Sequence, residues 1–279
     1  MSSQADQYAV IGNPIAHSKS PWIHRQFAAQ TGQQLEYHAM LAETDAFQQS
    51  VDAFAAAGGK GLNVTVPFKQ DAWRYADELS DRARLAEAVN TLSFSDGSCY
   101  GDNTDGVGLV RDLTANLNLQ LNGKRILILG AGGAVRGVLG PLLQAGPADI
   151  IVANRTISRA QDLIPVFNDL GNIQASGLDG IPCQEAFDLI INGTAASLQG
   201  DVPAIASECI NEQTDVYDMM YGASATPFMQ WAIQLGAKQA FDGLGMLVEQ
   251  AAESFYIWRQ VRPQTQPVIL SIREAMSAS

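Results

Sequence analysis

The chain has 279 residues and a formal net charge of −12, from 17 basic and 29 acidic side chains. Its length predicts two domains, and a hydrophobic fraction of 47% is sufficient for a core in each. An acidic surface repels nucleic acids and anionic membranes, so we expect neither as a partner. A small molecule is the expected ligand, bound where hydrogen-bond donors and a few cations are locally concentrated.

The cysteines and the apolar runs indicate the compartment. Cys99, Cys183 and Cys209 are odd in number, widely spaced and outside any CxxC arrangement. We therefore expect no disulfide framework, no zinc site and a reducing environment. The N-terminus lacks the pattern of a secretory signal, and no apolar run approaches the length of a membrane span. These features predict a cytoplasmic protein, and the spacing of its histidines predicts no metal site.

The first hundred residues predict alternating strands and helices. Runs that end at glycine or proline predict strands at 8–12, 36–41 and 61–66, and a hairpin that begins at 90–94 and turns at 95–97. Helices are predicted from Ser20 onward, at 44–57, at 70–78 and at 81–86. Ser20 suits the N-cap of its helix, and Pro21 suits the first helical position. Together these elements predict an α/β domain with a mixed sheet.

The rest of the chain predicts a second α/β pattern. After a helix at 107–116, an apolar strand at 124–129 ends in glycines, and a further helix and a strand at 149–153 complete a βαβ unit. Buried strands are also predicted at 188–192 and 215–219, a long helix at 244–262 and a shorter one after Pro267. We place residues 1–104 and 243–279 in one domain and residues 105–242 in a Rossmann-type, doubly wound domain.

A glycine-rich turn, GAGGAV, connects the strand at 124–129 to its helix. The first glycine permits a tight turn, the second lets the backbone approach a pyrophosphate, and the helix N-terminus offers free N–H groups. A tight turn without a ligand is the alternative, but the flanking strands and helix favour dinucleotide binding by Gly130, Ala131, Gly132, Gly133 and Ala134. Val135 replaces the usual small residue, so we expect the helix to lie further from the sheet and to bind the cofactor more weakly.

The end of the second strand of this unit indicates which dinucleotide binds. NAD binding usually places Asp or Glu there, to accept hydrogen bonds from the ribose hydroxyls. Here the polar residues are Asn154, Arg155, Thr156, Ser158 and Arg159. A solvated helix start is the alternative, but cations at a helix N-terminus are unfavourable without an anion. Two guanidiniums and neighbouring hydroxyls suit a 2′-phosphate, which predicts NADP.

Four polar loop clusters lie at or near strand ends, where α/β proteins build their sites: Ser18–Ser20, Asn63–Lys69, Asn90–Thr91 and Asp102–Asp105. Taken singly, each cluster also fits a helix cap, a turn or a solvated charge. Five motifs in order and spacing resemble the shikimate dehydrogenase family along essentially the whole chain: GNPIAHSKSP at 12–21, NVTVPFK at 63–69, AVNT at 88–91, GDNTDG at 101–106 and DGLGML at 242–247.

The resemblance implies an oxidoreductase with an N-terminal substrate domain and an NADP-binding Rossmann domain. Its reaction is the reversible NADPH-dependent reduction of 3-dehydroshikimate to shikimate, in aromatic amino-acid biosynthesis. One alternative is a quinate/shikimate dehydrogenase of relaxed specificity, against which Ser20 and Asn154–Thr156 argue. Another is an NADP-sensing regulatory protein that has lost the chemistry, against which the presence of both Lys69 and Asp105 argues. We expect a monomer or a homodimer.

The resemblance also implies roles for individual residues. The substrate carboxylate is expected to bind Ser18, Ser20 and Tyr221. The ring hydroxyls are expected to meet Asn63, Thr65, Lys69, Asn90, Asp105 and Gln250. The cofactor is expected to lie near Asp81, Met219 and Gly243. The segment NGTAAS at 192–197 departs from the NATS-like segment common in the family, so cofactor affinity is the property that the resemblance defines least.

Lys69 and Asp105 form the expected catalytic pair. Oxidation of a secondary alcohol requires removal of its proton as hydride leaves, and reduction of the ketone requires the reverse. Lys69 is expected either to transfer that proton or to act as an electrostatic clamp, while Asp105 positions it and binds hydroxyls.

Overall fold

The computed structural model describes residues 5–196 and 200–278 and divides into two compact units. The first unit comprises the residues up to Gly108 together with Val248–Val268, and the second comprises Leu109–Leu247 together with the residues from Ile269 onward. Two of these limits fall a few residues beyond those expected from the sequence, and the third assigns residues 269–279 to the second unit instead of the expected first domain. The limits lie inside helices α5 (Asp105–Arg111), α10 (Leu244–Arg259) and α11 (Gln266–Ser277), so no loop composition marks them.

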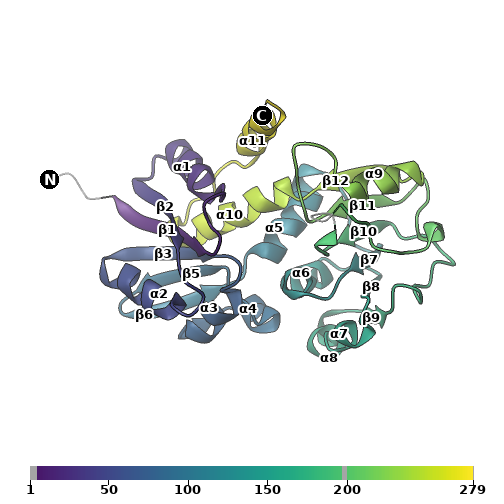
Figure 1. Cartoon of the computed structure of the whole chain (residues 1–279), viewed down its shortest axis with the longest axis horizontal. Coiled ribbons are helices and arrows are strands. Elements are labelled where there is room, and N and C mark those ends of the chain that lie inside the picture. Colours follow the sequence, from purple (N-terminus) through teal and green to yellow (C-terminus); the bar gives the residue numbers. More distant parts are fainter. Residues whose placement is uncertain (1–4, 197–199, 279) are drawn as a thin grey trace. The chain divides into compact units, whose positions relative to one another are not determined.

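The first unit is built on a mixed sheet, which confirms the predicted α/β architecture (Figure 1). Its strands are β1 (Asp6–Gly12), β2 (Leu35–Leu41), β3 (Gly59–Val64), β4 (Glu78–Leu79), β5 (Thr91–Ser95) and β6 (Ser98–Asp102). Their order is β2-β1-β3-β5-β6-β4. β1 runs parallel to β2 and β3, whereas β5 runs antiparallel to both β3 and β6.

Helices cover both faces of this sheet because side chains along β1 alternate between the faces. Ala9 and Ile11 join a core with residues of α2 (Phe47–Ala56), α3 (Lys69–Tyr75) and α4 (Asp81–Ala86). Tyr8 and Val10 face the opposite side, where Trp258 of α10 packs. The helices α2 and α3 are shorter than predicted. In α1 (Ser20–Thr31), Ser20 is already helical and Lys19 holds the N-cap position without a side-chain bond, so the predicted serine cap is wrong.

His24 on α1 is a core residue of this unit. Its ring is fully buried and stacks on Tyr37, with 4.2 Å between ring centroids and 4° between ring planes. The other rings around it belong to Phe27, Phe255 and Trp258. Burial lowers the pKa of His24 from 6.5 to about 3, so the folded protein holds this imidazole neutral.

We expect this histidine to make the folded protein sensitive to acid. Between pH 6.5 and about 3, the unfolded chain binds a proton at His24 that the folded chain excludes. As the pH is lowered through this window, the free energy of unfolding should therefore decrease, by up to about 1.4 kcal/mol per pH unit. Urea titrations of the wild type and of His24→Phe at several pH values will show a stability difference that changes with pH. A stability difference between the wild type and His24→Phe that does not change with pH would contradict the account.

The second unit has a parallel sheet with the order β12-β11-β10-β7-β8-β9. Its strands are β7 (Arg125–Leu129), β8 (Asp149–Ala153), β9 (Ile173–Ser176), β10 (Leu189–Asn192), β11 (Asp215–Asp218) and β12 (Gln239–Asp242). This is the 3-2-1-4-5-6 order of a Rossmann fold, which confirms the doubly wound prediction. Its helices are α6 (Gly133–Gln144), α7 (Ile157–Gln161), α8 (Ile164–Phe167), α9 (Pro227–Gln234) and α11 (Gln266–Ser277). The helix predicted at 107–116 is α5 followed by a π-helical segment, Asp112–Asn116.

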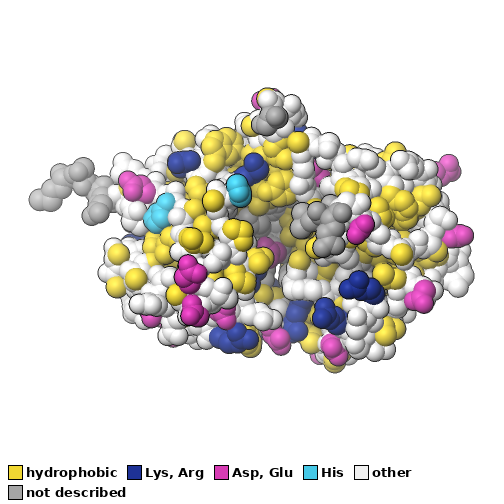
Figure 2. Space-filling model, viewed as in Figure 1, with side chains coloured by type: hydrophobic (Ala, Val, Ile, Leu, Met, Phe, Trp, Pro, Cys, Tyr) yellow, Lys and Arg dark blue, Asp and Glu magenta, His cyan; other side chains and the backbone are white. Residues whose placement is uncertain are grey.

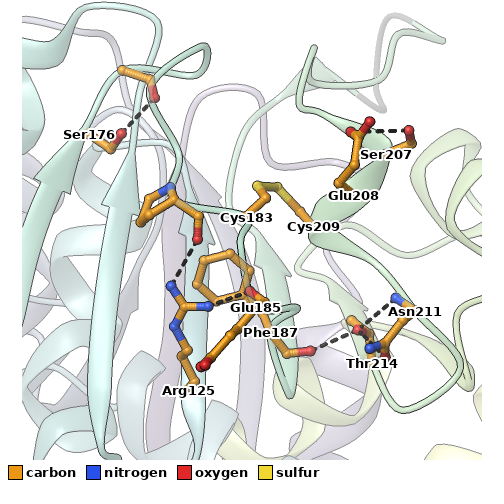
Figure 3. The surroundings of a disulfide bond; sticks show 12 residues. Arg125, Ser176, Cys183, Glu185, Phe187, Ser207, Glu208, Cys209, Asn211 and Thr214 are labelled. Carbon is orange, nitrogen blue, oxygen red and sulfur yellow. Dashed lines mark hydrogen bonds between the residues drawn. A yellow bond between two sulfur atoms is a disulfide. The ribbon is translucent and has the colours of Figure 1, made fainter.

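Cys183 and Cys209 form a disulfide in the second unit, contrary to the expectation of none (Figure 3). Their Cα atoms lie 4.6 Å apart although 26 positions separate them in the sequence. Both cysteines pack against the core that contains Phe187, on one face of the parallel sheet. The two cysteines are brought together by packing against the same core, and their spacing in the sequence does not indicate this contact. Cys99 of the first unit is a buried free thiol.

Candidate active site

Lys69 and Asp105 form a pair, as the resemblance implies, but Asp105 belongs to the first unit instead of the expected second domain. Lys69 Nζ donates to Asp105 Oδ2 over 2.6 Å, and the side chains are 31% and 13% exposed, respectively. Asn90 Nδ2 donates to the other carboxylate oxygen, Oδ1, over 2.8 Å. Each oxygen of Asp105 therefore has a donor, and the carboxylate is fixed in orientation. Lys69 keeps its remaining protons on the partly exposed side of the pair.

The register of the sheet explains why these residues meet. Asn63 of β3 pairs with Thr91 of β5, and Thr91 pairs with Asp102 of β6. β5 is antiparallel to its neighbours, so its first residue lies beside the ends of β3 and β6. The loop after β3 then carries Lys69, the residue before β5 is Asn90, and the loop after β6 reaches Asp105. Three chain segments deliver their polar residues to one edge of the sheet.

A buried hydrogen-bond network supports this edge. Asn63 accepts from Tyr37 Oη over 2.7 Å, and its amide donates to Ser254 Oγ over 2.9 Å and to the Asn90 carbonyl over 3.1 Å. Both ends of the Asn63 amide are thus bound within the protein. Gln250 on α10 joins the network through Oε1, which accepts from Asn90 over 3.4 Å. The sequence reading missed Tyr37 and Ser254, because strand and helix periodicity mark only their burial.

Two further loops lie side by side at the ends of β1 and β3. Thr65 N–H donates to the Ile11 carbonyl and Asn13 N–H donates to the Val66 carbonyl, both over 3.0 Å. A Cβ at Gly12 would lie 2.5 Å from Thr65 Cγ2, so only glycine allows the loops to approach. Ser20 N–H donates to Ser18 Oγ over 3.3 Å. The predicted residues Ser18 and Thr65 are therefore carried by these neighbouring loops, and Ser20 begins α1 directly after the first of them.

Two predicted site residues stand apart from this network. Asp81 begins α4, is 96% exposed and pairs with Arg84 over 2.9 Å. Tyr221 belongs to the second unit, where burial and then the Asp242 carboxylate raise the pKa of its hydroxyl. A protonated hydroxyl at neutral pH leaves Tyr221 able to donate a hydrogen bond.

The glycine turn of the second unit fits a dinucleotide. It follows β7, where the strand order reverses between β7 and β10, and ligands of such sheets bind at this switch point. Gly130 has φ +105°, which favours glycine, and its N–H donates to the Ala153 carbonyl over 2.8 Å. Apart from the adjoining residues and the backbone of α6 itself, no described heavy atom lies within 4 Å of a Cβ built at Gly132 or Gly133. The start of the twelve-residue helix α6 is therefore open to a pyrophosphate.

The residues after β8 fit a phosphate on the adenosine ribose. Arg155 and Arg159 are exposed, and neither forms an ion pair within the described residues. Asn154 Nδ2 donates to the Thr156 carbonyl over 2.8 Å, which fixes the turn between β8 and α7. Figure 2 shows Lys and Arg side chains gathered over the face where α6 and α7 lie. Residues 154–159 include no carboxylate, so an anion there meets only donors and cations.

Val135 lies against the loop that follows β10. It is completely buried, and a Cβ built at Gly193 would lie 2.4 Å from Val135 Cγ2. Gly193 N–H donates to the Leu129 carbonyl over 2.9 Å, so the loop after β10 lies against the glycine turn. The two departures from the family pattern therefore compensate one another: the valine occupies the space that the missing Cβ leaves. Ser197, the end of the departing segment, lies outside the described residues.

We expect Val135 and Gly193 to be energetically coupled. Gly193→Ala should lower the free energy of unfolding by about 1–3 kcal/mol, the usual cost of overpacking. Val135→Ala removes the side-chain atoms that a Cβ at position 193 would meet. In the Val135→Ala background, Gly193→Ala should therefore lower the free energy of unfolding much less. Chemical denaturation of both single variants and the double variant measures this coupling. Strict additivity of the two single effects would contradict the compensation.

The third cofactor segment lies beside the second. Met219 N–H donates to the Asn192 carbonyl over 2.9 Å, which places the end of β11 next to the loop after β10. Gly243 N–H donates to the Met220 carbonyl over 3.0 Å. A Cβ at Gly243 would lie 2.3 Å from the Met219 carbonyl oxygen, so this position requires glycine. Met219 and Gly243 thus lie together at the carboxyl ends of the strands, on the same side of the sheet as the glycine turn.

Three family models match the chain in sequence order. They are the shikimate dehydrogenase substrate binding domain at residues 10–92, shikimate/quinate 5-dehydrogenase at 112–214 and the shikimate 5′-dehydrogenase C-terminal domain at 243–269. A shikimate dehydrogenase (NADP(+)) of Cellvibrio japonicus is 56% identical over 97% of this chain and 98% of its own. That of Hahella chejuensis is 54% identical over 96% of this chain and 99% of its own.

Solved structures agree with these relatives. An Ael1 enzyme from Pseudomonas putida has a TM-score of 0.92 and 45% identity, over 96% of this chain and 98% of that one. Shikimate 5-dehydrogenase of Thermus thermophilus, solved with NADP(H) and shikimate, has a TM-score of 0.84 and 30% identity, over 97% and 99%. Full-length identity, three matching domain models and the paired lysine and aspartate agree, and this chain belongs to the shikimate dehydrogenase family.

Proposed function

We propose that this protein is an NADP-dependent shikimate dehydrogenase, which reversibly reduces 3-dehydroshikimate to shikimate in aromatic amino-acid biosynthesis. The observation that carries the proposal is the 2.6 Å pair of Lys69 and Asp105, fixed by Asn90 at the edge of the substrate-domain sheet. The first unit is the substrate domain, and the second is the NADP-binding domain. In both, the polar residues gather at the ends of strands.

The proton is moved by Lys69. When the cofactor is bound, NADPH supplies a hydride to the carbonyl carbon of the substrate. The Lys69 ammonium donates a proton to the carbonyl oxygen, and in the oxidation direction the neutral amine takes it back. Asp105 accepts a hydrogen bond from one N–H of the Lys69 ammonium and so directs another N–H toward the substrate. Asn90, which binds the second oxygen of Asp105, prevents the carboxylate from turning away.

The remaining substrate residues bind and orient the ring. Ser18, Ser20 and Tyr221 donate hydroxyl hydrogen bonds to the substrate carboxylate. Thr65, Asn90, Asp105 and Gln250 bind the ring hydroxyls. Asn63 contributes chiefly by holding the Asn90 carbonyl, because its own amide is already bound on both sides. These contacts hold the bound substrate in one orientation, so the reaction does not depend on a chance alignment of its reactants.

The cofactor is held by its phosphates and by backbone. The turn at Gly130–Ala134 and the N-terminus of α6 bind the pyrophosphate. Arg155 and Arg159, with Asn154, Thr156 and Ser158, bind the 2′-phosphate. Met219 and Gly243 border the nicotinamide, and Asp81 contributes a polar group near the cofactor.

The substrate is a small molecule, and the fold contributes no helix among its described residues that is both long and apolar enough to span a bilayer. We propose that the protein acts in the cytoplasm as a monomer or a homodimer. Sedimentation of the purified protein distinguishes the two assemblies, and cell fractionation tests the compartment.

The direct test of the reaction is product identification. Purified protein is incubated with 3-dehydroshikimate and NADPH, and the products are separated by chromatography. We expect one shikimate for each NADPH oxidised. Recovery of unchanged 3-dehydroshikimate and unoxidised NADPH would reject the proposed function. This holds even if the protein is found to bind NADPH.

A further inference from the structure

The C-terminal helix α11 carries an arginine whose guanidinium binds two separate segments of the NADP-binding unit. Arg273 donates to both carboxylate oxygens of Asp242, over 2.6 and 2.8 Å. It also donates to the Gly222 carbonyl over 3.2 Å. The Asp242 side chain is only 6% exposed, and the Arg273 side chain is 41% exposed. A bidentate pair with a nearly buried carboxylate fixes the guanidinium plane.

Each segment bound by Arg273 adjoins a proposed site residue. Gly222 follows Tyr221 directly, and Asp242 precedes Gly243. The Asp242 carboxylate also accepts from Leu244 N–H over 3.2 Å, so it shapes the turn on both sides of Gly243. Through the bond from Gly243 N–H to the Met220 carbonyl, this turn is joined back to the loop that carries Tyr221. One guanidinium thus joins two loops that are also connected by a backbone hydrogen bond.

We infer that Arg273 is a positioning residue for the reaction: it holds the Tyr221 loop and the Gly243 turn in one arrangement, at the nicotinamide side of the cofactor site. This inference rests on the proposed function. Arg273 touches neither substrate nor cofactor in this role. Its requirement is geometric, because the planar fork of arginine reaches a carboxylate and a carbonyl at once, whereas a lysine ammonium is a single point charge.

Loss of this link should loosen both loops together. In Arg273→Ala, the Asp242 carboxylate keeps its bond from Leu244 N–H but loses its charge partner, and Gly222 loses its donor. Small displacements of groups that border a reaction centre have large kinetic effects, so we expect kcat/KM for NADPH to fall about tenfold. Arg273→Lys restores the charge without the fork and should recover only part of this loss.

Two neighbouring variants separate positioning from stability. Glu274 is exposed and next in sequence, so Glu274→Ala should change neither kinetics nor melting temperature. Ile272 is buried, so Ile272→Ala should lower the melting temperature through lost packing. Because Ile272→Ala keeps the guanidinium, its kcat and both KM values should stay near those of the wild type at temperatures where it is folded.

A readout without catalysis completes the test. Hydrogen exchange of the amides around 220–222 and 243–245 should accelerate in Arg273→Ala and stay unchanged in Glu274→Ala. Unchanged exchange together with unchanged kinetics would overturn the inference, as would an Ile272→Ala variant with the same kinetic loss. If the wild type shows no dehydrogenase turnover, the proposed function fails. The exchange data and the affinity for NADPH then still decide whether Arg273 holds the two loops.

Discussion

Lys69→Ala should lower kcat by about 10²- to 10⁴-fold, the usual contribution of general acid–base catalysis. The expected loss follows from the geometry: Lys69 is the partly exposed member of a pair whose carboxylate is already fixed by Asn90. Several other donors also bind the substrate, so KM should change less than kcat. Steady-state kinetics in both directions will measure the two parameters separately.

Two variants define what Lys69 does. Lys69→Arg keeps a positive charge beside Asp105, but a guanidinium does not release its proton at working pH. If Lys69 transfers the proton, this variant should be nearly as slow as the alanine variant. A Lys69→Arg enzyme close to the wild type would instead identify an electrostatic clamp. Lys60→Ala, which removes an exposed lysine of the same unit, is the matched control and should leave kcat unchanged.

The combined variant Arg155→Ala/Arg159→Ala should raise the KM for NADP by about 10²- to 10⁴-fold, since each hydrogen bond to a charged group contributes about 1.5–3 kcal/mol. Both guanidiniums are exposed after β8 without an ion pair among the described residues, so their removal leaves no protein group unpaired. The KM for NAD should change little, because NAD has no 2′-phosphate. The measured quantity is therefore the ratio of the two effects.

A control that removes a positive charge elsewhere in the same unit separates local binding from the overall field. Lys238 immediately precedes β12, at the sheet edge opposite the glycine turn, and is 47% exposed. Lys238→Ala lowers the net charge by one unit but should leave the preference for NADP unchanged. Equal losses with NADP and NAD in the arginine variant would contradict the 2′-phosphate role.

Much of the fold is readable from the sequence because hydrophobic periodicity and turn residues mark its longer elements. The strands at 8–12 and 149–153 and the helix at 81–86 are found at or within a few residues of their predicted limits. β9 and β12 were not predicted. Each has only four residues, and β12 lies at a sheet edge with an exposed first residue, so neither shows a clear apolar run. Pairing with a neighbour, rather than local sequence, makes them strands.

The residues of the candidate site also differ in whether the sequence alone could identify them. Residues inside unusual motifs, such as Lys69 and Asp105, could be recognised because the chemistry restricts their types. Their supporting residues could not: Tyr37, Ser254 and Arg273 act through contacts with segments distant in sequence. The compensation of Val135 by Gly193 is of this kind too. Each residue alone indicates a weaker cofactor site, and only the structure shows that Val135 Cγ2 fills the space that a Cβ at position 193 would need.

The most direct measurement of the central claim is a set of initial rates from nicotinamide absorbance, with shikimate or quinate as substrate and NADP or NAD as cofactor. The account predicts that kcat/KM is highest for shikimate with NADP, and that replacement of either partner lowers it. Higher kcat/KM for quinate with NAD would contradict the assignment to a strict, NADP-dependent shikimate dehydrogenase. No turnover with any of the pairs would contradict the enzymatic function itself.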